Sequence, residues 1–162
     1  MGRIPVREEC RDILQKQNVP ENIIKHCLKV AEMSMDIARK LEDEKGIAVN
    51  RSLLRAAAML HDITKSKPGD HVLSGTKFLK NHGFNAVSEI VRTHGLYHLP
   101  EIRPDTIEQK ILFYADKRVI DDRIVSLDER FRYFQDRHPD TDKDTWKMQL
   151  NYCREIEKEL GL

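Results

Sequence analysis

Apolar residues recur at intervals of three and four along most of the chain, which is the period of an amphipathic helix. The pattern is clearest after Pro20, where Val30, Ile37 and Leu41 share one face and charged residues occupy the other. Gly46 follows as a typical C-terminal breaker. This segment predicts a long, half-buried helix over about residues 20–44.

The same period predicts a fold made of helices throughout. Asp105 and Glu108 have the spacing of a capping box, as do Ser126 and Glu129. Segments 67–70 and 95–104 are expected to be irregular, and the runs of β-branched residues that mark strands are missing. The expected helices span about residues 6–17, 20–44, 50–60, 72–80, 85–94, 105–120, 126–137 and 142–160. The sequence therefore predicts an all-α, compact bundle of about seven to eight helices.

Composition agrees with one globular domain over residues 1–162. Hydrophobic residues make up 40% and charged residues 34%, and no long linker divides the chain. The net charge of +1 lacks the electrostatic footprint of a nucleic-acid-binding protein, so any attraction for substrate must be local.

The chain ends and the cysteines indicate where the protein resides. Residues 1–10 lack the apolar core of a signal peptide, and no apolar run approaches the length of a membrane span. Cys10, Cys27 and Cys153 form no CxxC pair, and three is an odd number, so reduced thiols are expected. We expect a cytoplasmic protein.

Polar residues that fall on apolar helix faces carry the chemical information. His26, His94 and Asp116 each lie among apolar neighbours, and His61-Asp62 ends the most apolar helix of the chain. Each alone has an ordinary explanation, such as a core histidine that is hydrogen-bonded to the backbone. Together, imidazoles and carboxylates from four separate helices suit a transition metal, which also offsets the cost of burying them.

The order and context of these residues resemble the HD superfamily of metal-dependent phosphohydrolases, whose pattern is H…HD…D. The matching segments are "IIKHCLKVAEMSMDIA", "LLRAAAMLHDITK" and "ILFYADKRV". The variant "HDITK" is close to the HDIG subgroup, with Thr64 where that subgroup usually has glycine. The resemblance covers about residues 20–125 and implies an HD domain, with the helices of residues 126–160 packed on it.

Two further segments resemble the HD enzymes that hold two metals and hydrolyse diadenosine tetraphosphate. They are "HVLSGTKFL", which begins at His71, and "SEIVRTHG", which ends at His94. The resemblance implies that Asp62 bridges the two ions. The implied ligands are His26, His61, Asp62 and Asp116 for one metal, and Asp62, His71 and His94 for the other. His71 is equally readable as a mobile surface histidine, and His98 is better read as a loop residue.

The resemblance also implies the cofactor: one or two divalent ions of Fe, Mn, Co, Ni or Zn, with Mg as an alternative. Such ions lower the pKa of bound water and polarise a phosphoryl group. Asp62 and Lys65 are the expected catalytic residues.

Three basic residues are candidates for substrate binding. Lys65, Arg92 and Arg118 could each contact a phosphate oxygen. The alternative for each is an ordinary surface charge, and Lys117, beside Asp116, has the same ambiguity.

The expected activity is hydrolysis of a phosphate ester or anhydride of a nucleotide or small phosphorylated metabolite. A Gly-rich phosphate loop and a Gly-x-Ser-x-Gly elbow are both absent from the sequence. The alternatives are an HD-fold di-iron oxygenase and a regulatory or nucleotide-binding module without catalysis. The partner is expected to be a small substrate rather than a nucleic acid or a membrane. The last helix, with Trp146 and Tyr152, is expected to pack on the core, with a homodimer as the alternative.

Overall fold

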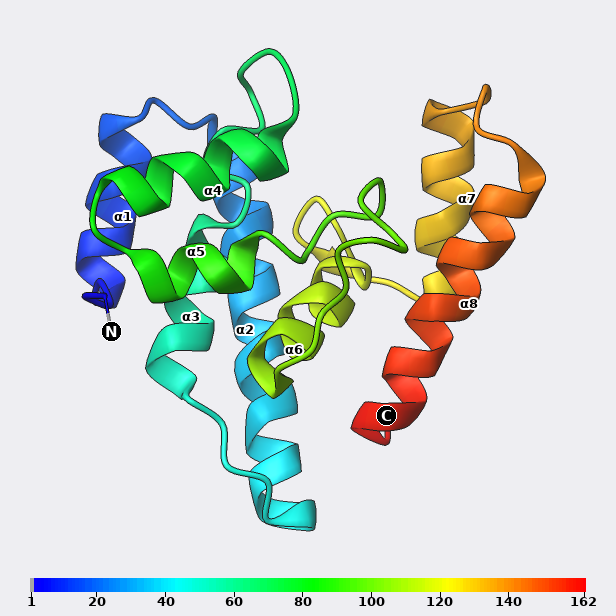
Figure 1. The fold of residues 1–162 in the computed structure, drawn as a ribbon, viewed down its shortest axis with the longest axis horizontal. Coiled ribbons are helices and arrows are strands. Elements are labelled where there is room, and N and C mark those ends of the chain that lie inside the picture. Colours follow the sequence, from blue (N-terminus) through cyan, green and yellow to red (C-terminus); the bar gives the residue numbers. More distant parts are fainter. Residues whose placement is uncertain (1) are drawn as a thin grey trace.

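The computed structural model describes residues 2–162, which form eight α-helices and one short β-hairpin (Figure 1). The expectation of an all-α bundle of seven to eight helices is therefore confirmed. The elements are α1 (Arg7–Lys16), α2 (Glu21–Lys45), α3 (Arg51–Leu60), α4 (His71–Asn81), α5 (Asn85–Val91), α6 (Ile107–Asp116), β1 (Val119–Ile120), β2 (Arg123–Ile124), α7 (Leu127–Arg137) and α8 (Lys143–Leu160).

Helix α3 lies at the centre of the fold and packs against α1, α2, α5 and α6. Its second half is buried on every side, with Leu54 and Leu60 inaccessible to solvent. The side chain of Asn50 accepts a hydrogen bond from the backbone N–H of Leu53 and so fixes the start of the helix. Because α3 is surrounded, the residues that follow Leu60 emerge inside the protein.

The long helix α2 ends as its sequence indicates. Gly46 adopts a left-handed conformation, with φ of 64°, and its N–H donates to the carbonyl of Glu42. The apolar face of α2 packs on α3 and α6 and includes the buried Val30 and Leu41.

The boundaries of α6 differ from expectation at both ends. Its cap is Thr106 rather than Asp105, and the capping box is completed by Gln109 rather than Glu108. The shift of one residue is favoured because the side chain of the buried Gln109 also donates to the carbonyl of Glu89.

The C-terminal end of the helix expected over residues 105–120 is a second correction. The helix stops at Asp116, and Val119–Ile120 pairs antiparallel with Arg123–Ile124. Asp121 turns the chain with a positive φ of 52°, a conformation that aspartate tolerates better than most residues. The expectation that the chain has no strands was wrong at this hairpin.

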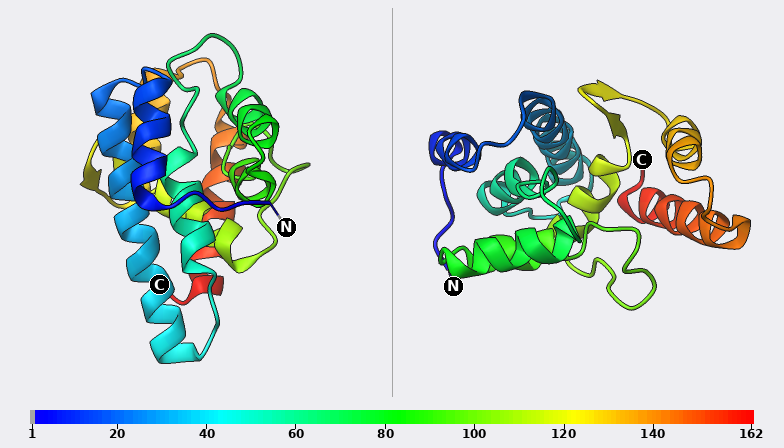
Figure 2. Two further views of the ribbon diagram at one scale, coloured as in Figure 1. Left: turned by 90° about the vertical axis from the view of Figure 1, so that its left-hand side faces the viewer. Right: turned by 90° about the horizontal axis from the view of Figure 1, so that it is seen from above.

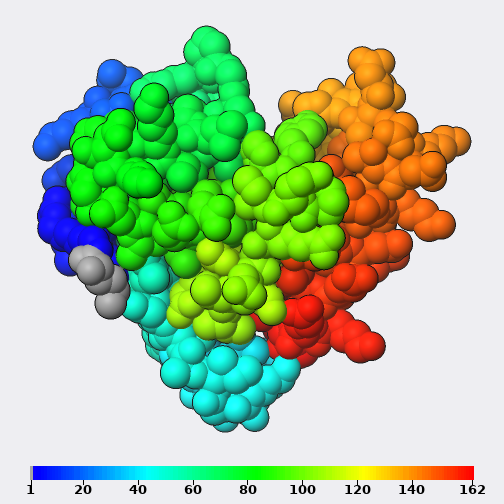
Figure 3. Space-filling model, viewed as in Figure 1, coloured from blue at the N-terminus to red at the C-terminus, as the bar shows by residue number. Residues whose placement is uncertain are grey.

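Helices α7 and α8 lie side by side at one end of the molecule (Figures 1 and 2). Phe131, Phe134 and Trp146 pack between them, with the rings of Phe134 and Trp146 stacked. Helix α8 also packs on α6, where Ile156 and Leu160 belong to the same core as the rest of the fold. The last helix thus packs on the core. In Figure 3 the surface is notched between the green part of the chain and the orange end of this pair.

None of the helices within residues 2–162 combines the length and the apolar character needed to cross a bilayer.

Truncation of a core residue in α8 tests how strongly this helix is held. Ile156→Ala is expected to lower the free energy of unfolding by about 2–5 kcal/mol, because Ile156 is 1% exposed. Urea denaturation measures the change. The control Met148→Ala, at a position 39% exposed on the same helix, is expected to change it by less than about 0.5 kcal/mol. Equal effects of the two substitutions would contradict the packing of α8 on the core.

Candidate metal centre

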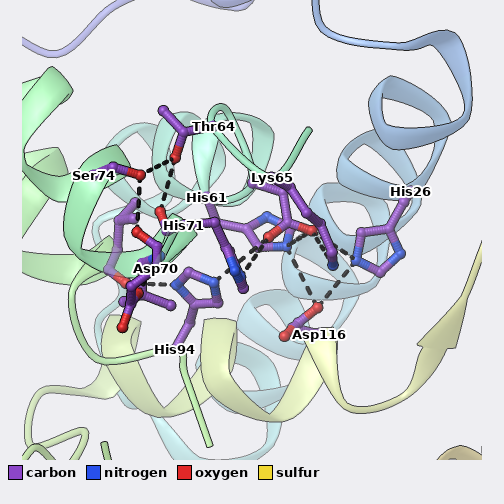
Figure 4. A network of polar contacts seen from close by, with 12 residues as sticks. His26, His61, Thr64, Lys65, Asp70, His71, Ser74, His94 and Asp116 are labelled. Carbon is purple, nitrogen blue, oxygen red and sulfur yellow. Dashed lines mark hydrogen bonds and ion pairs between the residues drawn. The ribbon is translucent and has the colours of Figure 1, made fainter. Parts of the chain in front are cut away.

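The six residues expected to bind metal meet at one place (Figure 4). Five elements of the fold deliver them: α2, the turn after α3, the start of α4, the turn after α5 and the end of α6. They are His26, His61, Asp62, His71, His94 and Asp116. All except His71, whose side chain is 29% exposed, are buried.

One group of donor atoms is formed by two imidazoles and two carboxylates. His26 Nε2 lies 3.0 Å from Asp116 Oδ1 and 3.7 Å from Asp62 Oδ2. His61 Nε2 lies 3.4 Å from Asp116 Oδ1 and 3.5 Å from Asp62 Oδ2. Ligands of one metal, each at about 2.0–2.2 Å from the ion, are separated by distances of this order.

A second group forms on the other side of Asp62. Its Oδ1 atom lies 3.4 Å from His71 Nε2 and 3.7 Å from His94 Nε2. Asp62 therefore presents one oxygen to each group. This is the arrangement of a carboxylate that can bridge two ions.

Backbone carbonyls orient three of the imidazoles. Nδ1 of His26, His61 and His94 lies 3.1, 2.7 and 2.6 Å from a carbonyl oxygen. The carbonyls belong to Asp121, Ala58 and Val91, respectively. A carbonyl can only accept, so each Nδ1 carries a hydrogen and donates it. In the neutral ring, the Nε2 lone pair then points into the cluster, as in many histidine ligands.

Two buried nitrogen atoms give an independent test of whether a metal fits. Nε2 of His61 and Nε2 of His94 are shielded from solvent and have no hydrogen-bond partner. Buried polar atoms are nearly always satisfied in native proteins. A metal ion would satisfy both atoms, and a mixed set of imidazole and carboxylate donors suits a divalent transition metal.

The protonation states also fit metal binding. Burial would raise the pKa of Asp62, but the positive charges of His61 and Lys65 hold it well below its usual range. Burial lowers the pKa of His94 and lowers that of His71 to about 4. At neutral pH these carboxylate and imidazole groups are thus in the states that metal ligands require.

The pKa of Asp116 is lowered, as that of Asp62 is, whereas the pKa of His61 is raised, unlike those of His71 and His94. Burial opposes the charge on Asp116, but Lys117 and His26 keep its pKa well below the usual range. Burial would lower the pKa of His61, but the charge of Asp62 raises it well above its usual value. Metal binding at His61 would therefore release a proton.

Two lysines lie against the carboxylates. Lys65 Nζ is 2.6 Å from Asp62 Oδ2. Lys117, which the sequence allowed as a surface charge, is 3% exposed; its Nζ atom pairs with Asp116 Oδ2 and donates to the carbonyl of His94 at 2.7 Å. The sequence left the role of Lys117 open, because a charged residue at the end of a helix is normally solvated.

The other basic candidates are not brought to the cluster. Arg92 is largely exposed and its Nε donates to Glu89 at 2.8 Å. Arg118 contacts Tyr114 and Glu157, on the side of α6 that faces α8. His98 pairs with Asp70 at 2.9 Å rather than with the cluster.

Thr64, at the usual glycine position of HDIG, supports the segment that carries His71. Its hydroxyl donates to the carbonyl of His71 at 2.9 Å and lies 2.8 Å from Ser74 Oγ. The side chain of Asp70 accepts hydrogen bonds from the backbone N–H groups of Val72 and Leu73 and so caps α4. His71 is consequently the first residue of a capped helix, one residue before the start of the expected helix over residues 72–80.

Arg130 is a further residue beside the cluster that sequence reasoning did not identify. It is 5% exposed and lines two pockets that reach the cluster. A signal was available, because Arg130 shares the helical stripe of Leu127, Phe131 and Phe134.

The sequence matches the HD domain family over residues 23–119, a segment that contains all six residues of the cluster. This chain belongs to the HD domain family. The helices α1, α7 and α8 lie outside the matched segment.

Curated relatives of this HD domain protein have several names. A tRNA (cytidine(56)-2'-O)-methyltransferase of Picrophilus torridus is 30% identical over 151 residues, which are 83% of this chain and 42% of the relative. An uncharacterised protein of Methanocaldococcus jannaschii is 27% identical over 132 residues, 72% of this chain and 78% of the relative. A dihydroneopterin 2',3'-cyclic phosphate phosphodiesterase of the same organism is 30% identical over 131 residues, 70% of this chain and 52% of the relative.

The chain spans only about half or less of the methyltransferase and of the phosphodiesterase. The names of these relatives therefore do not by themselves give the activity of the shared segment. None of the three names mentions diadenosine tetraphosphate, and that finer resemblance stays a prediction. No solved structure matches the chain.

Substitution of single donor residues is expected to show that the two groups of donor atoms bind separate ions. Because His71 contacts Asp62 only through Oδ1, His71→Ala should lower the manganese content from about two ions per chain to about one. Asp62→Ala should abolish binding at both positions. Equilibrium dialysis followed by elemental analysis measures the content.

The matched control is His82→Ala, which removes an exposed histidine at the C-terminal cap of α4, eleven residues after His71 at the start of the same helix. The control should retain the wild-type metal content. Wild-type content in His71→Ala would show that the second group does not hold an ion.

Proposed function

We propose that this protein is a metal-dependent phosphohydrolase that cleaves a phosphate ester or anhydride of a nucleotide or small phosphorylated metabolite. The observation that carries the proposal is the position of Asp62, whose two oxygens face separate groups of imidazoles while Lys65 lies beside it. Membership of the HD domain family and the phosphodiesterase among its relatives support the same class of reaction.

One or two divalent ions, of Fe, Mn, Co, Ni, Zn or Mg, would supply a water whose pKa is lowered from about 15.7 toward about 7 and would neutralise phosphoryl charge. His26, His61, Asp62 and Asp116 would hold one ion, and Asp62, His71 and His94 the other. The chain's own contribution is the fixed position of these groups and the exclusion of bulk water from them.

Lys65 has a second role in this proposal. Its Nζ atom lies against Asp62, and the residue lines both pockets. It can bind a non-bridging phosphoryl oxygen as a point charge and stabilise the charge that develops there. Lys117 instead holds Asp116 in place and keeps it ionised.

The substrate is proposed to be small. The net charge of +1 gives no extended basic surface for a long nucleic acid, and the pockets beside the cluster are lined by only a few cationic side chains. The printed name of the phosphodiesterase relative makes a cyclic phosphodiester a substrate to test first. A cytoplasmic location remains part of the proposal, and so does a homodimer as an alternative to the monomer.

A substrate panel tests this proposal. Manganese-loaded protein is expected to hydrolyse at least one compound among nitrophenyl esters, mononucleotides, 2',3'-cyclic nucleotides and dinucleoside polyphosphates, with turnover undiminished when oxygen is excluded. Asp62→Asn should lower kcat by about 10³-fold or more, because it removes the charge shared by both groups. His82→Ala serves as the control and should retain full activity.

Two results would contradict the proposal. Turnover that requires oxygen would indicate a di-iron oxygenase on this scaffold. A metal-loaded protein that binds a nucleotide but hydrolyses none of the compounds would indicate a regulatory module.

A further inference from the structure

Arg130 is a buried cation that forms no ion pair with any carboxylate of residues 2–162. The residue is 5% exposed, and its Nε atom is shielded from solvent without a hydrogen-bond partner. The half-buried Arg51 and the exposed Arg154, by contrast, form ion pairs with glutamate or aspartate. A buried donor that is left unsatisfied costs about 1–3 kcal/mol, and more when it is charged. Such a group is expected to have a partner that is not part of the chain.

The surroundings of Arg130 hold the guanidinium in place without satisfying it. Its central carbon lies 4.2 Å from the ring centroid of Phe134 and 5.5 Å from that of Tyr133. Aromatic faces attract a cation and restrict its movement, but they do not occupy the N–H donors in the plane of the guanidinium. Phe134 in turn stacks on Trp146 of α8, with ring centroids 6.0 Å apart and the rings inclined by 18°.

Two pockets meet at Arg130, beside the cluster of six candidate metal ligands. The first pocket is lined by residues of the second donor group and of α8, including His71, His94, Lys117 and Trp146. The second pocket is lined by His26, Asp62, Arg137 and His138, among others. The residues common to both pockets are Lys65, Arg130 and Phe134. Arg130 therefore lies at the junction of the two spaces that reach the cluster.

Two cations share this junction. Lys65 comes from the turn after α3 and Arg130 from α7, so they reach the same space from different parts of the fold. Both side chains line both pockets. An anion placed between these two cationic groups would relieve their mutual repulsion.

We propose that Arg130, together with Lys65, forms a subsite for a phosphate group of the substrate beside the metal cluster. The planar guanidinium can donate two parallel hydrogen bonds to phosphate oxygens, which a lysine cannot do. This inference rests on the proposed function, because it assigns a substrate group to the same site. It adds a residue of α7, which lies beyond the segment matched by the HD domain family.

Inorganic phosphate is the probe for this subsite. Isothermal titration of manganese-loaded protein with phosphate compares the wild type with Arg130→Met, which keeps an apolar side chain against Phe134 but removes the donors. The variant is expected to bind phosphate about 10-fold or more weakly, because hydrogen bonds to charged groups contribute about 1.5–3 kcal/mol. Its metal content should equal that of the wild type.

The control is Arg132→Met, which removes an exposed arginine from the same helix without touching either pocket. It should bind phosphate as the wild type does. Unchanged phosphate affinity in folded, metal-loaded Arg130→Met would overturn the proposal, as would loss of the metal from that variant.

A second variant covers the case in which Arg130→Met does not fold. Arg130→Lys keeps the positive charge but loses the paired donors, so its phosphate affinity should fall between those of the wild type and the methionine variant. An affinity equal to that of the wild type would overturn the bidentate contact.

Different results would contradict the proposed activity and the proposed subsite. A protein with no turnover on any phosphoester, but with phosphate binding that depends on Arg130, would contradict the hydrolase and leave the subsite intact. Turnover whose KM and kcat are the same in the wild type and in Arg130→Met would support the hydrolase and contradict the subsite.

Discussion

The negative charge of Asp62, buried at 1% exposure, is the constraint around which the rest of the structure is organised. A lone carboxylate at this depth would be protonated, because desolvation strongly disfavours its charged form. Here imidazoles approach both oxygens and Lys65 lies 2.6 Å from Oδ2. The charge is thereby retained mainly through His61 and Lys65, which follow α3, and through His94, which follows α5, against the opposing charge of Asp116 at the end of α6. The burial of α3 and the ionisation of the aspartate in the turn that follows it are therefore two aspects of one arrangement.

The ends of helices supply the orientation that this arrangement needs. The last carbonyls of an α-helix have no partner within the helix. At the end of α3 the carbonyl of Ala58 accepts from His61, and at the end of α5 the carbonyl of Val91 accepts from His94. Both histidines lie three residues after the carbonyl that they contact, so one local geometry is used twice. His26 lies within a helix and cannot use this device; its carbonyl comes from Asp121, in the turn of the β-hairpin. The hairpin that replaces the last turn of the expected helix thus has a function in the site.

Helical period and the burial of polar residues predicted the bundle and five residues of the cluster, because both depend on patterns that extend over many residues. The sixth, His71, was implied only by the resemblance to the two-metal HD enzymes. The details that failed depend on competition within one or two residues. Asp105 and Thr106 are both good caps, and the choice is made by a tertiary contact of Gln109 with α5 that no local pattern contains. Strands of two residues are too short to show the alternation of apolar and polar residues that predicts a strand. Arg92 and Arg118 were candidates because they adjoin motif residues, yet neighbours in sequence point away from each other on a helix. Arg130 was missed because it is far from the motifs in sequence and reaches the cluster only through the packing of α7.

The position of Arg130 depends on a chain of aromatic contacts that begins far from the cluster. Trp146 of α8 stacks on Phe134, and the ring of Phe134 lies under the guanidinium. Helix α8 is in turn held on α6, the helix that ends in Asp116. One helix thus fixes a cluster carboxylate at its end and, through α8, the cation of α7 that faces the same pockets. Helix α8 therefore touches the cluster through the helix of Asp116, whereas the four imidazoles belong to α2, α4 and the turns after α3 and α5. A substitution in the C-terminal pair of helices can thus change the position of Arg130 while the residues that would hold the metal stay the same.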